Sequence, residues 1–331
     1  MTQLPNIVVS ASIAFDHIMS FNGSFKDHIL VEKAHVLSVS FLIDSLKKHR
    51  GGVGGNVAYS LGLLGEPAAL VGTVGEDFGE YRSVLDQHGV DTSGVVEVGG
   101  ELTATGFLSA DLHGNQIVSF YPGAMWKSRE IDLTDAANGA VYGVVGAGDP
   151  EGMVLHTRQI AASSAKLVFD PSQQIPILTG DQLTEGIEAA DIMVANDYEY
   201  SMIERKTGLS IEDIRQRVEL TVVTYGEQGS EIRHGDEQVE IPIAPAREVV
   251  DPSGGGDAYR AGLLKGLLLG FDLDMVGRVA AQAATYPIEN YGTQEHVYDV
   301  PGFIARFEES FPEYAGRLHE SDMVAAIADR S

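Results

Sequence analysis

A run of three glycines at the start of an apolar helical stretch constrains this chain more than any other feature. Residues 254–256 follow the strand-like residues 248–250 and precede residues 263–269, whose apolar run predicts a buried helix. Glycines leave the backbone amides bare at the helix N-terminus, where free N–H groups and the helix dipole bind anions. Asp257 falls in the first helical turn, and its side chain leans back toward that anion.

The position of Asp257 indicates a chemical role. A carboxylate beside an anion site is electrostatically unfavourable. Its presence there therefore indicates a chemical task, such as accepting a proton from an attacking hydroxyl. Ala258, Ala261 and Gly262 are small, which predicts that the helix lies close against a sheet. A P-loop is excluded because no Gly-Lys-Ser/Thr follows, and a dinucleotide fingerprint would need a glycine at Tyr259. The alternative is a glycine-rich loop with an ordinary acidic first turn.

A second glycine-rich stretch also leads into a helix. Gly51 and Gly52 precede an apolar segment that contains Asn56 and ends near Gly65, a residue typical of a helix C-terminus. Glycines let a ligand lie against the backbone, and Asn56 offers both a donor and an acceptor from the first turns.

Strands and helices alternate along most of the chain. The predicted strands cover residues 5–14, 68–74, 142–147, 166–170 and 191–195, and the predicted helices between them include residues 77–90 and 150–163. Such alternation predicts a mainly parallel sheet covered by helices on both faces. No internal repeat or linker interrupts it, so residues 1–331 are expected to form a single domain.

Residues 35–43 and the pair 103–110 and 116–121 have alternating apolar patterns typical of exposed strands. The pair flanks a predicted hairpin turn at residues 113–115.

Composition excludes several classes of partner. The chain has 22 Lys and Arg against 48 Asp and Glu, a net charge of −26, which argues against binding nucleic acid or an acidic membrane surface. It has no cysteine, and no apolar run reaches the length of a membrane span. We expect a cytoplasmic protein.

The stretch at residues 251–262 resembles the C-terminal signature of the ribokinase-like (PfkB) carbohydrate and nucleoside kinases, with Ser253 for a threonine and Gly255 for the usual alanine. The stretch from Gly51 to Asn56 resembles the sugar-binding N-terminal signature of the same family. The resemblance implies a three-layer αβα fold with a mainly parallel sheet and a small β lid, formed here by approximately residues 17–50 and 101–126.

The resemblance also implies roles for the residues of both stretches. The anion hole for the transferred phosphoryl group falls on Gly254, Gly255 and Gly256, and the general base on Asp257. In the N-terminal stretch, the sugar is held by Gly51, Gly52 and Asn56.

Further motifs match family positions that bind magnesium and ATP. Asn196 and Glu199 fit an Asn-x-x-Glu motif that positions Mg²⁺ and its waters, although similar patterns also cap helices. Residues 224–229 fit a turn that contacts the nucleotide, although a plain tight turn into residues 230–234 explains them equally well. The residues implied in nucleotide binding are Asn196, Thr224, Gly226, Gly229 and, in the adenine loop, Asn290. A candidate K⁺ site falls on Asp251 and Ser253.

Within the family, residues 120–125, 170–174 and 292–295 are similar to bacterial adenosine kinases. That similarity implies that Ser12 and Asp16 hold the ribose, although Asp16 could equally cap a local loop. The purine would lie between Phe120 and the glutamines Gln173 and Gln174, which could also be solvated loop residues. The sequence departs from this group at Gly106, because those kinases have at this position a second aromatic residue that stacks on the purine.

The sequence therefore predicts an ATP- and Mg²⁺-dependent kinase that phosphorylates the 5′-hydroxyl of a purine nucleoside, most simply adenosine. The alternatives are a sugar kinase, a kinase of inosine, guanosine or cytidine, and a nucleoside-binding sensor without turnover. Apolar lid strands predict a homodimer formed through the lid.

Overall fold

The structure is a computed structural model that describes residues 5–28 and 39–325. Within these residues a nine-stranded sheet has the order β13-β12-β11-β10-β9-β8-β1-β4-β5, with only β12 and β13 antiparallel to their neighbours. Its strands are β1 (Ile7–Ser10), β4 (Ala68–Val74), β5 (Val95–Glu97), β8 (Tyr142–Gly146), β9 (Lys166–Asp170), β10 (Ile192–Asn196), β11 (Leu220–Thr224), β12 (Ser230–His234) and β13 (Glu237–Ile241). The predicted mainly parallel sheet is confirmed.

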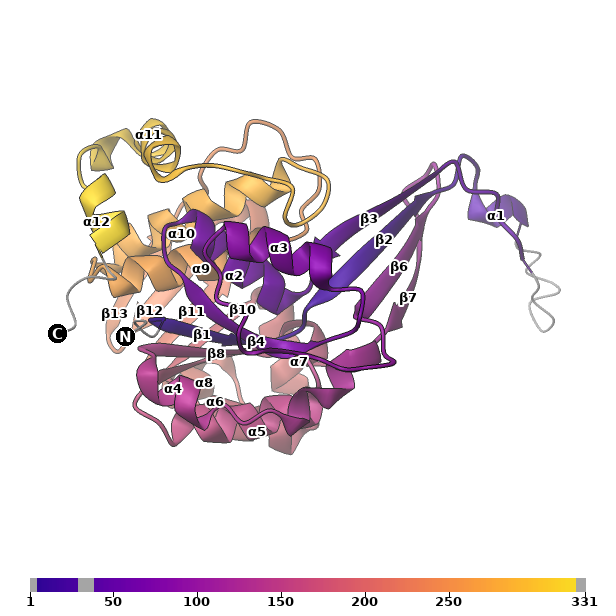
Figure 1. The fold of residues 1–331 in the computed structure, drawn as a ribbon. Coiled ribbons are helices and arrows are strands. Elements are labelled where there is room, and N and C mark those ends of the chain that lie inside the picture. The colour runs from indigo at the N-terminus through magenta and orange to yellow at the C-terminus, as the bar shows by residue number, and fades with distance from the viewer. Residues whose placement is uncertain (1–4, 29–38, 326–331) are drawn as a thin grey trace.

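Helices cover both faces of this sheet (Figure 1). On one face lie α2 (Val53–Leu63), α3 (Gly79–Gln87), α9 (Gly255–Leu268), α10 (Leu273–Ile288), α11 (Val300–Ser310) and α12 (Glu320–Ala325). On the other lie α4 (Thr134–Gly139), α5 (Pro150–Ala161), α6 (Gly180–Ala189), α7 (Asp197–Thr207) and α8 (Ile211–Arg215). Short 3₁₀ segments occupy Gly123–Glu130, Ser172–Gln174, Gly226–Gln228 and Pro312–Tyr314.

Strand β1 shows why the sheet is buried on both sides. Ile7 and Val9 point into the core beneath α2 and α9, whereas Val8 points into the core beneath α5 and α6. Because successive strand residues face opposite sides, an uninterrupted apolar run needs a layer of helices on each face.

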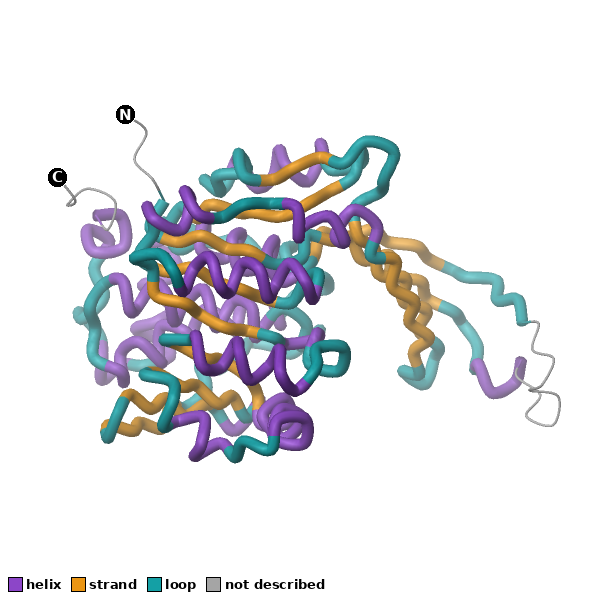
Figure 2. Tube along the Cα trace, turned by 90° about the horizontal axis from the view of Figure 1, so that it is seen from below, coloured by secondary structure: helices purple, strands orange, loops and turns teal. Residues whose placement is uncertain are grey.

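A four-stranded sheet forms the lid, in the order β3-β2-β6-β7. Its strands are β2 (Ala14–Ser20), β3 (Ser45–Gly51), β6 (Ala104–Ala110) and β7 (Gln116–Tyr121), and the short helix α1 (Phe25–His28) lies beyond the end of β2. The lid projects from the body of the molecule as a separate arm in two perpendicular views (Figures 1 and 2). The predicted pairing of residues 103–110 with 116–121 is confirmed.

Two predictions about the lid strands were wrong. Residues 5–14 are not one strand, because the chain leaves the main sheet after Ser10 and enters the lid at Ala14. Of the predicted strand 35–43, residues 35–38 lie outside the described residues, and residues 39–43 are not a strand. The strand in this part of the lid is β3, which the apolar pattern missed because it is a charged edge strand containing Lys47 and Lys48.

Two expectations around α9 also need correction. Residues 248–250 form no strand, because the Val250 amide donates instead to the carbonyl of Ile288 at the end of α10. The small residues of α9 allow close packing against α10 rather than against the sheet. A methyl group added to Gly262 would lie 2.7 Å from the Cα of Ala280.

A buried ion pair ties α9 to distant parts of the chain. The side chains of Lys265 and Glu66 are fully buried, and Lys265 Nζ lies 3.0 Å from Glu66 Oε2. Lys265 also donates to the carbonyl of Met323 in α12, and Asn6 Nδ2 donates to the other Glu66 oxygen. The pair therefore joins the start of β1, the helix α9 and the last described helix.

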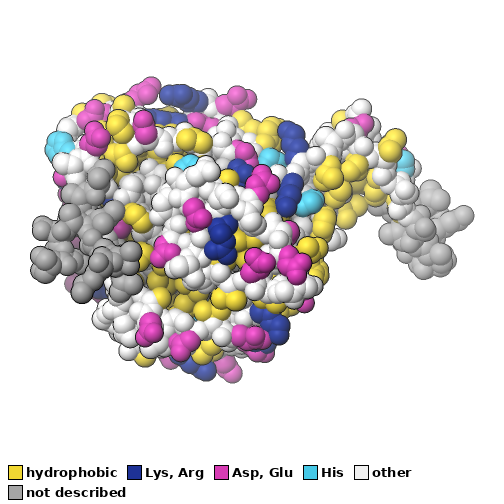
Figure 3. Space-filling model, in the orientation of Figure 1, with side chains coloured by type: hydrophobic (Ala, Val, Ile, Leu, Met, Phe, Trp, Pro, Cys, Tyr) yellow, Lys and Arg dark blue, Asp and Glu magenta, His cyan; other side chains and the backbone are white. Residues whose placement is uncertain are grey.

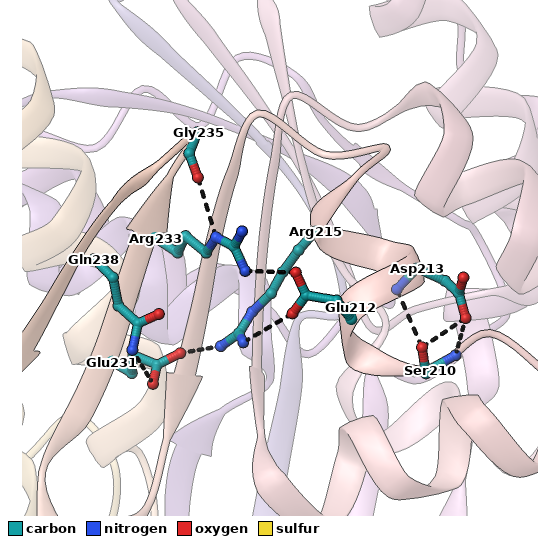
Figure 4. A network of polar contacts seen from close by, with 8 residues as sticks. All are labelled: Ser210, Glu212, Asp213, Arg215, Glu231, Arg233, Gly235 and Gln238. Atoms are coloured by element: carbon teal, nitrogen blue, oxygen red, sulfur yellow. Dashed lines mark hydrogen bonds and ion pairs between the residues drawn. The ribbon is translucent and has the colours of Figure 1, made fainter.

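A second polar network lies at the antiparallel edge of the main sheet (Figure 4). Arg215 of α8 forms ion pairs with Glu212 and with Glu231 of β12. Arg233 reaches the same Glu212, and Gln238 of β13 donates to Glu231. These contacts hold α8 against the strands that follow the turn at residues 226–229.

Among the residues that the structure describes, no helix has the length and apolar character needed to cross a membrane.

Candidate active site

Helix α9 begins at a glycine that has no side-chain cap. Gly254 is its N-cap, with φ of +80°, a conformation that side chains rarely allow. The amides of Gly255, Gly256 and Asp257 have no hydrogen-bond acceptor among the described residues. Three donors therefore converge at a helix N-terminus, an arrangement that suits an anion.

The Asp257 carboxylate lies in the first turn of α9 and is held on both sides. Its Oδ2 accepts a hydrogen bond of 2.8 Å from Asn56 Nδ2 in α2, and its Oδ1 lies 3.6 Å from Arg260 Nη1. Burial raises the pKa of Asp257 to about 6, although the Arg260 charge and the Asn56 hydrogen bond pull the pKa down. A carboxylate with this pKa can accept a proton near neutral pH.

Asn56 is itself fixed by two residues that the sequence reasoning missed. Its Oδ1 accepts from Thr293 Oγ1 and from Gln294 Nε2, each at 2.8 Å. Thr293 also donates to the carbonyl of Arg50 in lid strand β3. Both lie in the segment 292–295 that resembles adenosine kinases, but no local pattern indicates their contact with Asn56, because they come from the far end of the chain.

Arg260 and Asp170 form a second unpredicted pair beside Asp257. Arg260 Nε lies 2.5 Å from Asp170 Oδ2, and its Nη2 donates to Asp170 Oδ1 at 2.7 Å. Asp170, at the end of β9, is fully buried. The available signal was a charged residue three positions after Asp257 on a largely apolar helix.

A cleft of about 180 Å³ lies where β9, β10 and β11 end and α9 begins. This place fits the rule that ligands of open α/β sheets bind at the carboxyl ends of strands. Among the predicted site residues, the cleft is lined by Gln173, Asn196, Glu199, Thr224, Gly254, Gly256 and Asp257.

Asn196 and Glu199 form a reciprocal capping box at the start of α7. Asn196 Oδ1 accepts from the Glu199 amide, and Glu199 Oε2 accepts from the Asn196 amide, each at 2.8 Å. The capping alternative is therefore correct as a local description. Burial raises the pKa of Glu199, and the Asn196 amide opposes that rise. Within the described residues, Glu199 Oε1 and the side-chain nitrogen of Asn196 have no hydrogen-bond partner, and both residues line the cleft.

The N-terminal glycine stretch makes a different contact. Gly52 is the N-cap of α2, with φ of +85°, and the Val53 amide donates to Ser12 Oγ at 3.1 Å. Asp16 lies in β2 on the lid, where a methyl group added to Gly51 would fall 2.4 Å from its Oδ2. Burial raises the pKa of Asp16, and the neighbouring His49 opposes that rise.

Gly106 makes room for Asp16 on the other side. A methyl group at Gly106 would lie 2.6 Å from Asp16 Oδ1. The absence of an aromatic residue here thus coincides with a carboxylate filling the same space.

The remaining predicted residues do not line this cleft. Phe120 lies on outer lid strand β7 and is 52% exposed, and Ser12 lines a small polar cavity between β1 and α5. Asp251 Oδ1 accepts from the Ser253 amide in an exposed turn. Four more residues lie outside the cleft lining. The backbone amide of Gln174 donates to the carbonyl of Pro171, and the side chain of Asn290 donates to the carbonyl of Tyr286. Gly226 and Gly229 lie in the turn after β11.

Known proteins resemble this chain over most of its length. The profile of the pfkB family carbohydrate kinase matches residues 16–299. The nucleoside kinase of Methanothermobacter thermautotrophicus is 34% identical over 275 residues, which are 82% of this chain and 88% of that protein.

The nucleoside kinase of Burkholderia thailandensis has been solved in complex with inosine and in complex with ADP-inosine. The first structure has a TM-score of 0.83 and 36% identity, covering 92% of this chain and 98% of that chain. The second has a TM-score of 0.81 and 37% identity, with coverage of 92% and 96%.

The chain belongs to the PfkB family of carbohydrate kinases. It is accordingly a phosphotransferase that acts on an alcohol group.

Proposed function

We propose that this protein is a nucleoside kinase that transfers the γ-phosphoryl group of ATP to the 5′-hydroxyl of a purine nucleoside. One observation carries the proposal: a carboxylate with a raised pKa lies beside three free amides in a cleft at the ends of parallel strands. The similarity to nucleoside kinases, including one that binds inosine and ADP-inosine, supports a nucleoside acceptor.

In the proposed mechanism Asp257 accepts the proton of the 5′-hydroxyl. The hydroxyl oxygen forms a bond to the γ-phosphorus, and the bond from that phosphorus to the bridging oxygen breaks, releasing ADP with the electron pair. The amides of Gly255, Gly256 and Asp257 stabilise the negative charge on the transferring group, which is the main requirement of phosphoryl transfer.

The residues present fit a magnesium ion. Glu199 Oε1 remains available to accept from the waters of a Mg²⁺ ion, whereas the free side-chain nitrogen of Asn196 is a donor that suits a phosphate oxygen rather than the metal. When bound, Mg²⁺ neutralises phosphate charge. The proposed K⁺ site at Asp251 and Ser253 stays a prediction.

For the nucleoside we propose that Asp16 and Ser12 hold the ribose under the lid, while Gln173 and Phe120 approach the base. Gln173 lines the cleft, whereas Gln174 does not. A glutamine amide can both donate and accept, so it suits adenine and also the hypoxanthine of inosine. We favour adenosine as substrate, with inosine as the alternative that the Burkholderia complex supports.

The lid is also the proposed site of homodimer formation. Its exposed apolar side chains include Leu46, Phe107, Ile117, Val118 and Phe120. Figure 3 shows apolar side chains gathered on the arm that the lid forms. A second copy would cover them, because a small sheet has little core of its own.

The test is an ADP-release assay over adenosine, inosine, guanosine, cytidine, ribose and fructose 6-phosphate, with parent protein and Gln173→Ala and Gln174→Ala variants. We expect purine nucleosides to be the best substrates. Gln173→Ala should weaken their binding by about 1–3 kcal/mol, and Gln174→Ala should have less effect on binding. Turnover of ribose equal to that of adenosine would make the protein a sugar kinase. Nucleoside binding without ADP release would make it a sensor.

A further inference from the structure

The charges around the cleft are unusual for a site that binds a triphosphate. Two carboxylates, Asp257 and Glu199, line the cleft, and Asp170 lies directly behind it. Among the described residues of the lining, Arg260 is the single lysine or arginine. Arg260 is therefore the one positively charged group in the described lining that can attract phosphate into this cleft.

Arg260 is held so that one edge of its guanidinium is fixed and the other is free. Its Nε and Nη2 face Asp170, and Nη2 also donates to Ser172 Oγ at 3.2 Å. The third nitrogen, Nη1, has no acceptor within hydrogen-bond distance among the described residues, since Asp257 Oδ1 lies 3.6 Å away. The Nη1 atom would be 2.9 Å from a methyl group added to Gly256, so it lies beside the free amides of α9.

The residue that braces Arg260 is itself strained. Ser172 has φ of +38° and is the one non-glycine residue with positive φ in the described part of the chain. Such a backbone costs about 1–3 kcal/mol and persists only where its surroundings enforce it. Ser172 Oγ also donates to Asp170 at 2.6 Å, so the strained residue completes the support of the guanidinium.

We propose that Arg260 is a catalytic residue whose Nη1 donates a hydrogen bond to the phosphoryl group as it moves from ATP to the acceptor, with Asp170 and Ser172 fixing its orientation. This inference rests on the proposed function. A planar guanidinium can grip Asp170 with one edge and present donors to phosphate with another, which a lysine cannot do. It also explains how the Asp257 carboxylate and an anionic phosphoryl group share one small site.

The test separates contact with phosphate from an indirect effect on the base. Asp257 faces Asn56 of α2, Arg260 of α9, Asp170 of β9 and Glu199 of α7. If Arg260 acted only by lowering the pKa of Asp257, Arg260→Gln would shift the acidic limb of the kcat profile upward and leave the high-pH plateau unchanged. Contact with phosphate predicts a loss on the plateau itself.

We expect Arg260→Gln to lower the plateau kcat roughly 10²–10³-fold, the effect of losing one donor to developing charge. The KM for the nucleoside should change only a few-fold. Arg260→Lys keeps the positive charge but cannot bind Asp170 and phosphate at the same time, so its plateau kcat should fall nearly as much. In Arg260→Ala, guanidinium at a concentration too low to unfold the protein should restore part of the rate.

Arg278→Gln is a control for the loss of a largely buried arginine away from the cleft, because Arg278 is 11% exposed and pairs with Asp274, which is 33% exposed. It should keep the parent kcat. An unchanged plateau in Arg260→Gln or Arg260→Lys, or an equal loss in Arg278→Gln, would overturn the inference. A fully active Asp257→Asn variant would instead overturn the proposed mechanism, so the two failures are distinguishable.

Discussion

Helices α2 and α9 begin in the same way and end up with different tasks. Both have a glycine N-cap with positive φ, +85° at Gly52 and +80° at Gly254, and neither has a side-chain cap of its own. At α2, however, Ser12 accepts from two amides of the first turn, through its Oγ and through its carbonyl. At α9 the corresponding amides have no acceptor in the described residues.

The difference shows that a glycine-rich helix start is only a potential anion site. What decides its use is whether another part of the chain supplies an acceptor. The protein fills the α2 start with Ser12 and leaves the α9 start open toward a cleft that also contains a carboxylate. The comparison predicts that changes at α9 affect turnover, whereas changes at α2 affect stability.

The largest expected effect is that of Asp257→Asn at the open start. Turnover should fall roughly 10²–10⁴-fold, the usual contribution of a positioned base, while nucleoside binding persists. Steady-state kinetics and calorimetric binding measure the two quantities. If the variant kept most of its kcat, the assignment of the base would be wrong.

The next effect concerns α7, a third helix start, which is capped by its own side chains. Glu199→Gln preserves the capping hydrogen bond but removes the charge, so stability should hold while the half-saturating magnesium concentration rises roughly 10–100-fold. Magnesium titration of kcat tests this. An unchanged titration would leave Asn196 and Glu199 as a helix cap alone.

The pKa of Asp257 gives a smaller, continuous effect. With a pKa of about 6, the base is ionised above pH 6 and becomes protonated below it. We therefore expect kcat/KM, which reports the pKa of the free enzyme, to fall about tenfold per pH unit on the acidic side of pH 6. A profile flat down to pH 4.5 would contradict this assignment.

Alanine at the two N-caps compares the helix starts directly. Each substitution imposes backbone strain of roughly 1–3 kcal/mol. At Gly52 the new methyl group would also lie 2.6 Å from the backbone of Ser12 and Ala14, whereas at Gly254 it meets the Thr293 side chain at 3.0 Å. Urea unfolding should show that Gly52→Ala lowers the free energy of unfolding more than Gly254→Ala does. Steady-state kinetics should show that Gly254→Ala loses more kcat for each kcal/mol of lost stability. The reverse pattern would refute the comparison.

The smallest effect is expected from Ser12→Ala. Losing the acceptor for the Val53 amide should lower the free energy of unfolding by about 1 kcal/mol. Because Ser12 is also proposed to hold the ribose, the nucleoside KM should rise as well, and an unchanged KM would leave Ser12 as an acceptor for the start of α2 alone.

The sequence was sufficient for much of the fold because apolar strand runs and helical segments alternate along it. The prediction failed where the local apolar pattern does not match the burial of the strand in the folded protein. Strand β3 is charged because it is an edge strand, and the run at residues 5–14 divides between two sheets.

The candidate site was predictable where its residues lie in short motifs, as at residues 254–257 and at Asn196 and Glu199, which the structure brings to one cleft. Arg260 pairs with Asp170, 90 residues away, and Asn56 depends on Gln294, 238 residues away. No spacing along the chain reveals such contacts, since they arise from the order of strands in the sheet.

The buried pair between Lys265 and Glu66 has a consequence for the history of this sequence. Loss of either partner would leave an uncompensated charge in the core, at a cost of roughly 3–5 kcal/mol, whereas exchanging both for apolar residues can be neutral. Positions 66 and 265 should therefore covary among relatives, changing together or not at all. Because Lys265 also holds the Met323 carbonyl, the same covariation should extend to whether a relative retains a helix equivalent to α12.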